Sequence, residues 1–325
     1  MSASPPSPRP RVAVLGASGI GRHHANWWTV EGAEVCAILG SSEESLAATT
    51  DRLRDMFGFT GRGYTDLDSL LAAEQPDIVD VCTPPELHYA HAKTALAADC
   101  QVLCEKPFVY DASLPVETLL SQARELLDLA AENGRLFGIC TQYVVASEIC
   151  LDLAHELHGA DRPLTFRGEL VSPTRGRAPD PVRTWVDLSP HMLGALQVLA
   201  PRGEIRWESL RTDFEQHCAR ARFQVELPDG KVLEAEVYTD HTDGEPSNVR
   251  RLQFGNVVCD IEGAKDGDGH FCADIRIESQ SFLFPDSMRL LIRRFLAGEA
   301  AVPGPAALVG LERMLRVISH TQGSR

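Results

Sequence analysis

Residues 75–108 read QPDIVDVCTPPELHYAHAKTALAADCQVLCEKPF and contain two short apolar runs, at 78–82 and 101–104. Each run is bounded by a turn signal or a charged residue, as buried parallel strands are. Pro84–Pro85 lie between the runs and open a segment whose apolar positions recur at helical spacing. Those positions are Leu87, Ala90, His91, Thr94, Ala95 and Ala98. The stretch therefore predicts a strand, a helix and a second, parallel strand.

A lysine follows the second run directly, in the sequence Glu105–Lys106–Pro107. The carboxyl end of a parallel strand is where open α/β sheets bind their ligands. We therefore expect Lys106 at the chemical centre of the protein. The alternative is a surface lysine that happens to follow a strand.

A glycine-rich turn lies near the start of the chain, where the expected strand 11–15 runs into GASGIG at residues 16–21. Glycines at such a turn let the backbone approach a pyrophosphate, which the next helix N-terminus attracts. The fingerprint G-x-G-x-x-G asks for glycine at position 18, where serine stands, so the motif alone is also compatible with simple turn chemistry. The strand before it, the helix after it and another strand at 35–39 favour dinucleotide binding. The expected cofactor contacts from this turn are Gly16, Ser18, Gly19, Ile20 and Gly21.

The end of the second strand bears on the choice between NAD and NADP. A carboxylate there would bind the ribose 2′-hydroxyl, but the sequence reads Leu39–Gly40–Ser41–Ser42. Two hydroxyls are thus available to a 2′-phosphate, and we expect NAD(P) binding with a preference for NADP. Alternatively, Ser41 and Ser42 cap the helix that begins at the following glutamates.

The order of predicted elements indicates two domains. Strands and helices alternate from residue 11 to about 141, which predicts an α/β domain with a Rossmann-type, doubly wound parallel sheet. The remainder predicts an α+β domain with an open, mostly antiparallel sheet and two closing helices. We expect a disordered leader at 1–10, a dinucleotide-binding domain at 11–143 and a substrate or dimerisation domain at 144–325. The expected helices are 44–57, 67–73, 113–133, 147–158, 188–199, 287–296 and 306–318, and the expected later strands are 136–141, 164–171, 205–212, 218–227, 232–240, 249–254, 257–261 and 272–277.

Composition excludes several classes of partner. The 325 residues carry a formal charge of −15, which argues against nucleic acid and anionic membranes, and no apolar run approaches the ~20 residues of a membrane helix. Nine scattered cysteines without a Cys-x-x-Cys pair are typical of reduced, buried thiols in a cytoplasmic protein. No histidine, cysteine or carboxylate group has metal-like spacing, so we expect no metal. His23 and His24 are expected to be solvated or packed against the glycine turn.

Four motifs together resemble the Gfo/Idh/MocA oxidoreductases, along essentially the whole chain. They are the glycine turn 16–21, Val81-Cys-Thr-Pro-Pro85 followed by His88, Val102-Leu-Cys-Glu-Lys-Pro107, and Asp187-Leu-Ser-Pro-His191. The resemblance implies hydride transfer between a nicotinamide and a carbonyl or alcohol of a sugar-like substrate, in a homo-oligomer (dimer or tetramer). It also implies that a small molecule is the main partner.

The resemblance implies a role for each matching residue. Lys106 would hydrogen-bond the reacting oxygen, His191 would be the general acid/base, and Asp187 would be its neighbour in the site. Reduction of a carbonyl needs such a positive donor and then a proton. Asp187 and His191 share one face of a helix because they are four residues apart, although Asp187 could instead cap a helix beginning at Leu188. The remaining cofactor-lining residues would be Thr83, Pro84, His88 and Glu105, together with Lys106.

The sequence departs from the family pattern beside the expected substrate pocket. Residues 183–186 read RTWV where the family has a glycine cluster, and residues 141–145 read TQYVV where it has an arginine-bearing motif. The substrate therefore stays open, and Trp185 and Tyr143 are either a pocket wall or core aromatics. Two alternatives also stay open: a non-catalytic dinucleotide-binding regulatory protein, and an oxidoreductase for an imine or dihydrodiol.

Overall fold

The computed structural model describes residues 9–159 and 162–323, so the expected leader lies almost wholly outside the described residues. The chain forms two compact units. The first contains the chain up to Cys140 together with Leu291–Pro305. The second contains Thr141–Leu290 together with the chain from Ala306 onwards.

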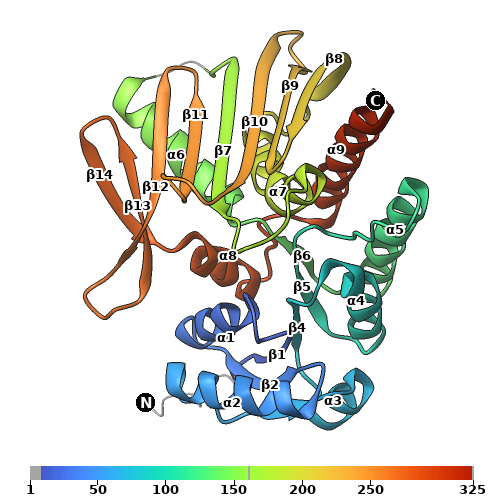
Figure 1. The fold of residues 1–325 in the computed structure, drawn as a ribbon. Coiled ribbons are helices and arrows are strands. Elements are labelled where there is room, and N and C mark those ends of the chain that lie inside the picture. The colour runs from blue at the N-terminus through green and yellow to red at the C-terminus, as the bar shows by residue number, and fades with distance from the viewer. Residues whose placement is uncertain (1–8, 160–161, 324–325) are drawn as a thin grey trace. The chain divides into compact units, whose positions relative to one another are not determined.

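A six-stranded parallel sheet organises the first unit (Figure 1), in the order β3-β2-β1-β4-β5-β6. This is the strand order of a Rossmann fold, and the predicted doubly wound sheet is confirmed. Helices α1 and α2 contact each other beside β1 and β2, whereas α4 contacts β4, β5 and α5. The strands are β1 (Arg11–Leu15), β2 (Glu34–Leu39), β3 (Arg62–Tyr64), β4 (Ile78–Val81), β5 (Gln101–Glu105) and β6 (Phe137–Cys140). The helices are α1 (Gly21–Val30), α2 (Glu43–Phe57), α3 (Leu67–Glu74), α4 (His88–Ala97) and α5 (Val116–Glu132).

Three details of the first unit differ from the sequence prediction. Strand β3 was not predicted, because its three residues at the edge of the sheet carry no apolar pattern. Helix α5 begins at Val116 and not at 113, because Pro115 disfavours helical backbone in the residue before it. The expected apolar face of α4 was also wrong. A 3₁₀ turn at Pro85–Leu87 precedes α4, and Leu87 in this turn is 44% exposed. The buried residues of α4 are His88, Ala92, Ala95 and Leu96.

An eight-stranded sheet organises the second unit, in the order β14-β13-β12-β11-β7-β10-β9-β8. All neighbouring pairs are antiparallel except β7 and β10, so the predicted mostly antiparallel sheet is confirmed. Helices α6 and α7 cover one face of it (Figure 1). The strands are β7 (Thr165–Pro173), β8 (Glu204–Glu215), β9 (Cys218–Glu226), β10 (Val232–Thr242), β11 (Val249–Phe254), β12 (Val257–Lys265), β13 (Phe271–Ile277) and β14 (Gln280–Pro285). Two helices lie wholly in this unit, α6 (Gln142–His158) and α7 (Pro181–Leu199). Helices α8 (Ser287–Leu296) and α9 (Gly304–Gly323) each belong partly to both units, because Leu291–Pro305 are part of the first.

Helix α7 begins seven residues earlier than the predicted start at Leu188. Asp180 caps it by accepting a hydrogen bond from the backbone N–H of Arg183 at 2.9 Å, and Pro181 occupies the first turn, where its missing N–H costs nothing. Helix α6 likewise begins at Gln142 and not at 147. Strand β14 was not predicted, because an edge strand tolerates the exposed residues and the proline at Pro285.

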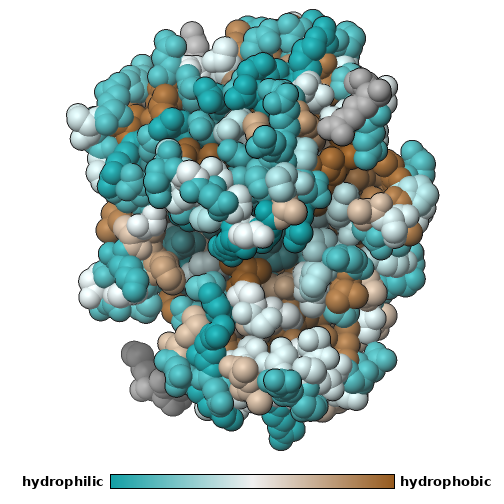
Figure 2. All heavy atoms as spheres, in the orientation of Figure 1, coloured by the Kyte–Doolittle hydropathy of each residue, from teal (hydrophilic) through white to brown (hydrophobic). Residues whose placement is uncertain are grey.

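Cross-strand ion pairs lie on the strands of the second sheet. Arg222 pairs with Glu236 from β9 to β10 at 2.6 Å, and Arg251 pairs with Asp260 from β11 to β12 at 2.7 Å. Hydrophilic residues predominate over these strands in the face shown in Figure 2. Among the described residues, no helix is both long and apolar enough to cross a membrane.

Candidate active site

The predicted cofactor residues of the first unit gather at one edge of its sheet. Strands β1, β4 and β5 are parallel neighbours, so their carboxyl ends meet there. The glycine turn follows β1, Thr83–Pro84 follow β4, and Lys106 follows β5. The order of strands reverses between β1 and β4, and ligands bind at such a switch point in open α/β sheets.

The glycine turn requires glycine at both of its ends. Gly16 has φ +85°, and a Cβ there would lie 2.7 Å from the carbonyl oxygen of Cys82. A Cβ on Gly21 would lie 2.7 Å from the carbonyl oxygen of Gly16. Between them, Ser18, Gly19 and Ile20 are exposed, so the serine that departs from the fingerprint does not obstruct the turn.

The N-terminus of α1 is open to an anion. Within the described part of the chain, no side chain caps α1 at Ile20, and its first turn holds no acidic residue. Helices α2, α3 and α7 are capped by Ser42, Asp66 and Asp180, whereas α4, α5 and α6, like α1, have no side-chain cap among the described residues. With no side-chain cap from the described residues and no acidic residue at its start, the helix dipole of α1 suits a phosphate beside the exposed turn, so these residues fit the pyrophosphate of a dinucleotide.

Ser42, at the end of β2, acts as a helix cap. Its Oγ accepts a hydrogen bond from the backbone N–H of Ser45 at 3.2 Å, which confirms the capping interpretation for this residue. Ser41 is exposed beside it, and Glu43 and Glu44 form the first turn of α2. A preference for NADP stays a prediction.

His88 joins the ends of β4 and β5. Its Nε2 lies 2.8 Å from the carbonyl oxygen of Thr83, and its Nδ1 lies 2.9 Å from that of Pro107. The side chain is 1% exposed, and this burial lowers the pKa of His88, whereas the two carbonyls favour its protonated form. A neutral ring donates to only one of these carbonyls. His88 thus holds the two strand ends together, and its predicted contact with the cofactor stays a prediction.

A buried charge network lies beside the same strand ends. His24 on α1 approaches Asp80 on β4, with 2.9 Å between Nδ1 and Oδ2. Its Nε2 lies 3.2 Å from Oε1 of Glu105, the last residue of β5. Trp28 donates its indole N–H to Oδ2 of Asp80 at 2.6 Å, and the Cys82 thiol donates to Oδ1 at 3.4 Å. We call the set His24, Asp80 and Glu105 the buried triad.

His24 is charged in this environment. Burial alone would lower the pKa of its imidazole, but Asp80, by charge and by hydrogen bond, and Glu105 raise that pKa to about 10. The expectation that His24 is solvated or packed on the turn was wrong, because it is 1% exposed and paired with carboxylates. Burial, reinforced by the nearby carboxylates, raises the pKa of the Cys82, Cys104 and Cys140 thiols well above its usual range.

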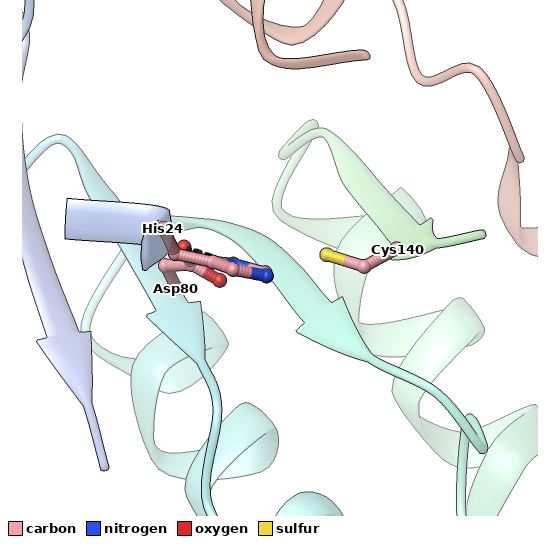
Figure 3. Close-up of side chains that lie close together, drawn as sticks. All are labelled: His24, Asp80 and Cys140. Atoms are coloured by element: carbon pink, nitrogen blue, oxygen red, sulfur yellow. Dashed lines mark hydrogen bonds and ion pairs between the residues drawn. The ribbon is translucent and has the colours of Figure 1, made fainter. Parts of the chain in front are cut away.

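His24, Asp80 and Cys140 also meet the distance criterion of a metal site. Their ligand atoms lie within 4.8 Å of one another, and the side chains converge from α1, β4 and β6 (Figure 3). Sequence spacing cannot show this group, because the fold assembles it. Both ring nitrogens of His24 already contact carboxylates, so the ion pairs account for the geometry. The absence of a metal stays a prediction.

The second unit holds the other predicted catalytic residues on α7. Asp187 and His191 lie one helical turn apart, and Asp187 lies well inside the helix, so the interpretation of Asp187 as a cap was wrong. The ring of Tyr143 packs edge-on against that of His191, with 5.0 Å between centroids. Trp185 is a core residue, because it is 0% exposed and donates its N–H to the carbonyl of Met314.

Asp187 has two partners that the sequence did not reveal. Nε2 of His241 on β10 lies 3.3 Å from Oδ2 of Asp187, and Nη1 of Arg177 lies 3.4 Å from the same oxygen. The Nδ1 atom of His241 lies 3.2 Å from Oγ1 of Thr184, which holds the ring from its other side. No motif marks His241, because only the pairing of β10 with β7 and the packing of α7 bring it here.

Lys106 is half-buried, directly after β5. It belongs to the first unit, whereas Asp187 and His191 belong to the second. The common site of these three residues therefore stays a prediction.

The comparisons with known proteins agree with this fold. Residues 10–140 match the family model described as "Oxidoreductase family, NAD-binding Rossmann fold". The chain is 34% identical over 130 residues to D-glucoside 3-dehydrogenase of Escherichia coli (strain K12). The aligned stretch covers 39% of this chain and 33% of that protein. The chain spans only between about a quarter and a third of the length of the first curated relatives it matches.

Solved structures resemble the whole chain. UDP-N-acetylglucosamine 3-dehydrogenase from Acidithiobacillus ferrooxidans superposes with a TM-score of 0.70 at 20% identity, over 95% of this chain and 97% of that one. An inositol dehydrogenase homologue from Azotobacter vinelandii, complexed with NADH and myo-inositol, superposes with a TM-score of 0.67 at 17% identity, over 98% and 97%. At such identities the likeness shows the fold. The match of residues 10–140 to this family model confirms the predicted resemblance to the Gfo/Idh/MocA oxidoreductases.

Proposed function

We propose that the protein is an NAD(P)-dependent oxidoreductase that transfers a hydride between the nicotinamide and a carbonyl or alcohol of a sugar-like substrate. The observation that carries the proposal is the edge of the first sheet, where the uncapped α1, the glycine turn and Lys106 follow neighbouring strands. The relatives support the substrate class, because they are named as dehydrogenases of a glucoside, a nucleotide sugar and an inositol.

Each proposed catalytic residue has one task. The nicotinamide, when bound, supplies or accepts the hydride. Lys106 donates a hydrogen bond to the reacting oxygen and stabilises the negative charge that develops when a carbonyl is reduced. His191 gives that oxygen its proton, or takes the proton when an alcohol is oxidised. His191 suits this task because imidazole titrates near neutral pH. Asp187, held by His241 and Arg177, is the proposed charged neighbour of His191.

The finer predictions are part of the same proposal. We propose a preference for NADP, supported by the absence of a carboxylate among residues 39–42 and by the exposed Ser41. We also propose that residues 11–143 bind the cofactor and residues 144–325 the substrate, in a cytoplasmic homo-oligomer. None of the nine cysteines, all within the described ranges, forms a disulfide, which supports a reducing compartment.

The test is a cofactor-coupled assay. The protein is mixed with NADPH or NADH and a panel of ketosugars, or with NADP⁺ or NAD⁺ and the matching polyols, and absorbance at the nicotinamide band is followed. We expect turnover that falls by about 10²-fold or more in Lys106→Ala and in His191→Ala. Unchanged turnover in both variants would contradict these roles. Tight cofactor binding without turnover on any substrate would favour the regulatory alternative.

A further inference from the structure

We propose that His24 is a positioning residue for Lys106, through the Glu105 carboxylate that it holds. This inference rests on the proposed function, because it concerns the lysine assigned there to the reacting oxygen. Its starting observation is the buried triad, in which one imidazole bridges carboxylates from two neighbouring strands. Glu105 and Lys106 are adjacent in the chain, so restraint of Glu105 restrains the backbone from which Lys106 projects.

The Asp80 side of the triad is fully buried and hydrogen-bonded. Asp80 is 0% exposed and lies in β4, a central strand of the sheet. Its Oδ2 receives the contacts of both His24 and Trp28, and its Oδ1 accepts from the Cys82 thiol. With both oxygens engaged, Asp80 holds the imidazole in a single orientation, and the second ring nitrogen of His24 then faces Glu105.

Both contacts of His24 are made by the charged ring. An imidazole donates from both nitrogens only when it is protonated, and both carboxylates are acceptors only. The Cys82 thiol, which also lies 3.3 Å from Nδ1 of His24, donates to Asp80. Two carboxylates and one imidazolium leave one net negative charge in the triad. The other titratable groups around it are Arg22 and His23 on α1, the thiols of Cys82, Cys104 and Cys140, and Lys106 itself. Removal of His24 would leave two buried carboxylates without their shared cation, which is strongly unfavourable.

The position of His24 explains why its loss would be felt in catalysis. His24 lies on α1, the helix whose open N-terminus fits the pyrophosphate, and it contacts the strand end that bears Lys106. One side chain therefore ties the proposed cofactor helix to the proposed catalytic lysine. A displacement of about 1 Å in a catalytic group costs up to about 10²-fold in rate.

The experiment compares His24→Gln and Glu105→Gln with Trp28→Phe as the matched control. Trp28→Phe removes a hydrogen bond of the same buried cluster but leaves the contact between His24 and Glu105. We expect the two glutamine variants to lower kcat by about 10- to 100-fold. We also expect faster amide exchange in residues 103–109 by mass spectrometry. Trp28→Phe should lower the melting temperature while both of these readouts stay near wild type.

A measurement on the unmodified protein keeps the inference testable if the variants fold poorly. ¹⁵N spectra of the histidine rings should show both nitrogens of His24 protonated at pH 8. A neutral His24 at that pH would overturn the inference. Equally slow amide exchange of residues 103–109 in His24→Gln and in Trp28→Phe would also overturn the inference. A stoichiometric metal, found by elemental analysis and bound through His24, Asp80 and Cys140, would also overturn it.

The exchange and NMR readouts need no substrate. If the protein turned over no compound yet showed these two signatures, the proposed function would fail while the restraint of Glu105 by His24 would stand. If it turned over sugars and His24→Gln kept full activity and slow exchange, only the inference would fail.

Discussion

His241 on β10 reaches Asp187 on α7, with 3.3 Å between Nε2 and Oδ2, although 53 residues separate the two in the chain. Its other ring nitrogen is held by Thr184, so the imidazole is fixed against the helix that also carries His191. Asp187, the proposed charged neighbour of His191, is thus positioned by a residue of strand β10.

From this relationship we predict that His241→Phe lowers kcat by about tenfold with a smaller effect on KM, because Asp187 loses the partner that orients it. Steady-state kinetics with the best substrate of the panel provide the measurement. His270→Asn, in a loop of the same unit, is the matched control and should behave as wild type. Equal kinetics for His241→Phe and wild type would contradict the orienting role of His241.

The glycine turn predicts different effects at two glycines. Gly16→Ala places a Cβ 2.7 Å from a backbone carbonyl at φ +85°, so it should lower the free energy of unfolding by about 1–3 kcal/mol. Gly19→Ala places its Cβ in open space and should change that free energy by less than about 0.5 kcal/mol. Urea denaturation measures both. Equal stability of the two variants would contradict the geometry of the turn.

His88→Phe should destabilise the protein by about 1–3 kcal/mol, because the ring bridges the buried carbonyls of Thr83 and Pro107 and the one to which it donates would lose its donor. Cofactor affinity, measured by the fluorescence of bound NADH, should fall in the same variant because the ends of β4 and β5 separate. Tyr89→Phe, at the next residue, removes only exposed hydrogen bonds, to Glu125 and from Lys93, and is the control. A His88→Phe protein with wild-type stability would exclude the bridging role.

The charge on His24 predicts how stability depends on pH. Its pKa is about 10 in the folded protein and about 6.5 in an unfolded chain, so the folded state binds the extra proton between these values. The stabilisation is complete below about pH 6.5 and is lost as the pH rises through 10, at no more than about 1.4 kcal/mol per pH unit. The urea midpoint should therefore fall more steeply from pH 7 to 10 in wild type than in His24→Gln. Parallel profiles would contradict the raised pKa.

Local patterns predicted the elements with continuous apolar runs. Strands β1, β2, β4 and β5 and the helix after the glycine turn were visible because buried parallel strands and turn glycines leave marks in a few residues. Strands β3 and β14 were not, because edge strands need no such marks. The start of α7 was placed too late, because the Pro- and Arg-rich segment before Leu188 looks like a loop until Asp180 is seen to cap it.

The site divides in the same way. Lys106 and the glycine turn were predictable because each stands next to the element that positions it. The buried triad and the contact between His241 and Asp187 were not, because each joins residues from separate elements that only the completed fold brings together. For His24, nothing in the neighbouring sequence indicates whether the ring is solvated or buried in an ion pair.

The return of Leu291–Pro305 to the first unit has a consequence for how the protein is made. Phe295 packs edge-on against Trp28, and the backbone N–H of Ile139 in β6 donates to the carbonyl of Val302. A ribosome that has made only the first 143 residues has therefore not yet supplied the chain that covers Trp28 and pairs with β6. The first unit is thus completed only after residue 305 is made, so a fragment ending at residue 143 should be aggregation-prone, whereas one ending after Pro305 should retain this packing.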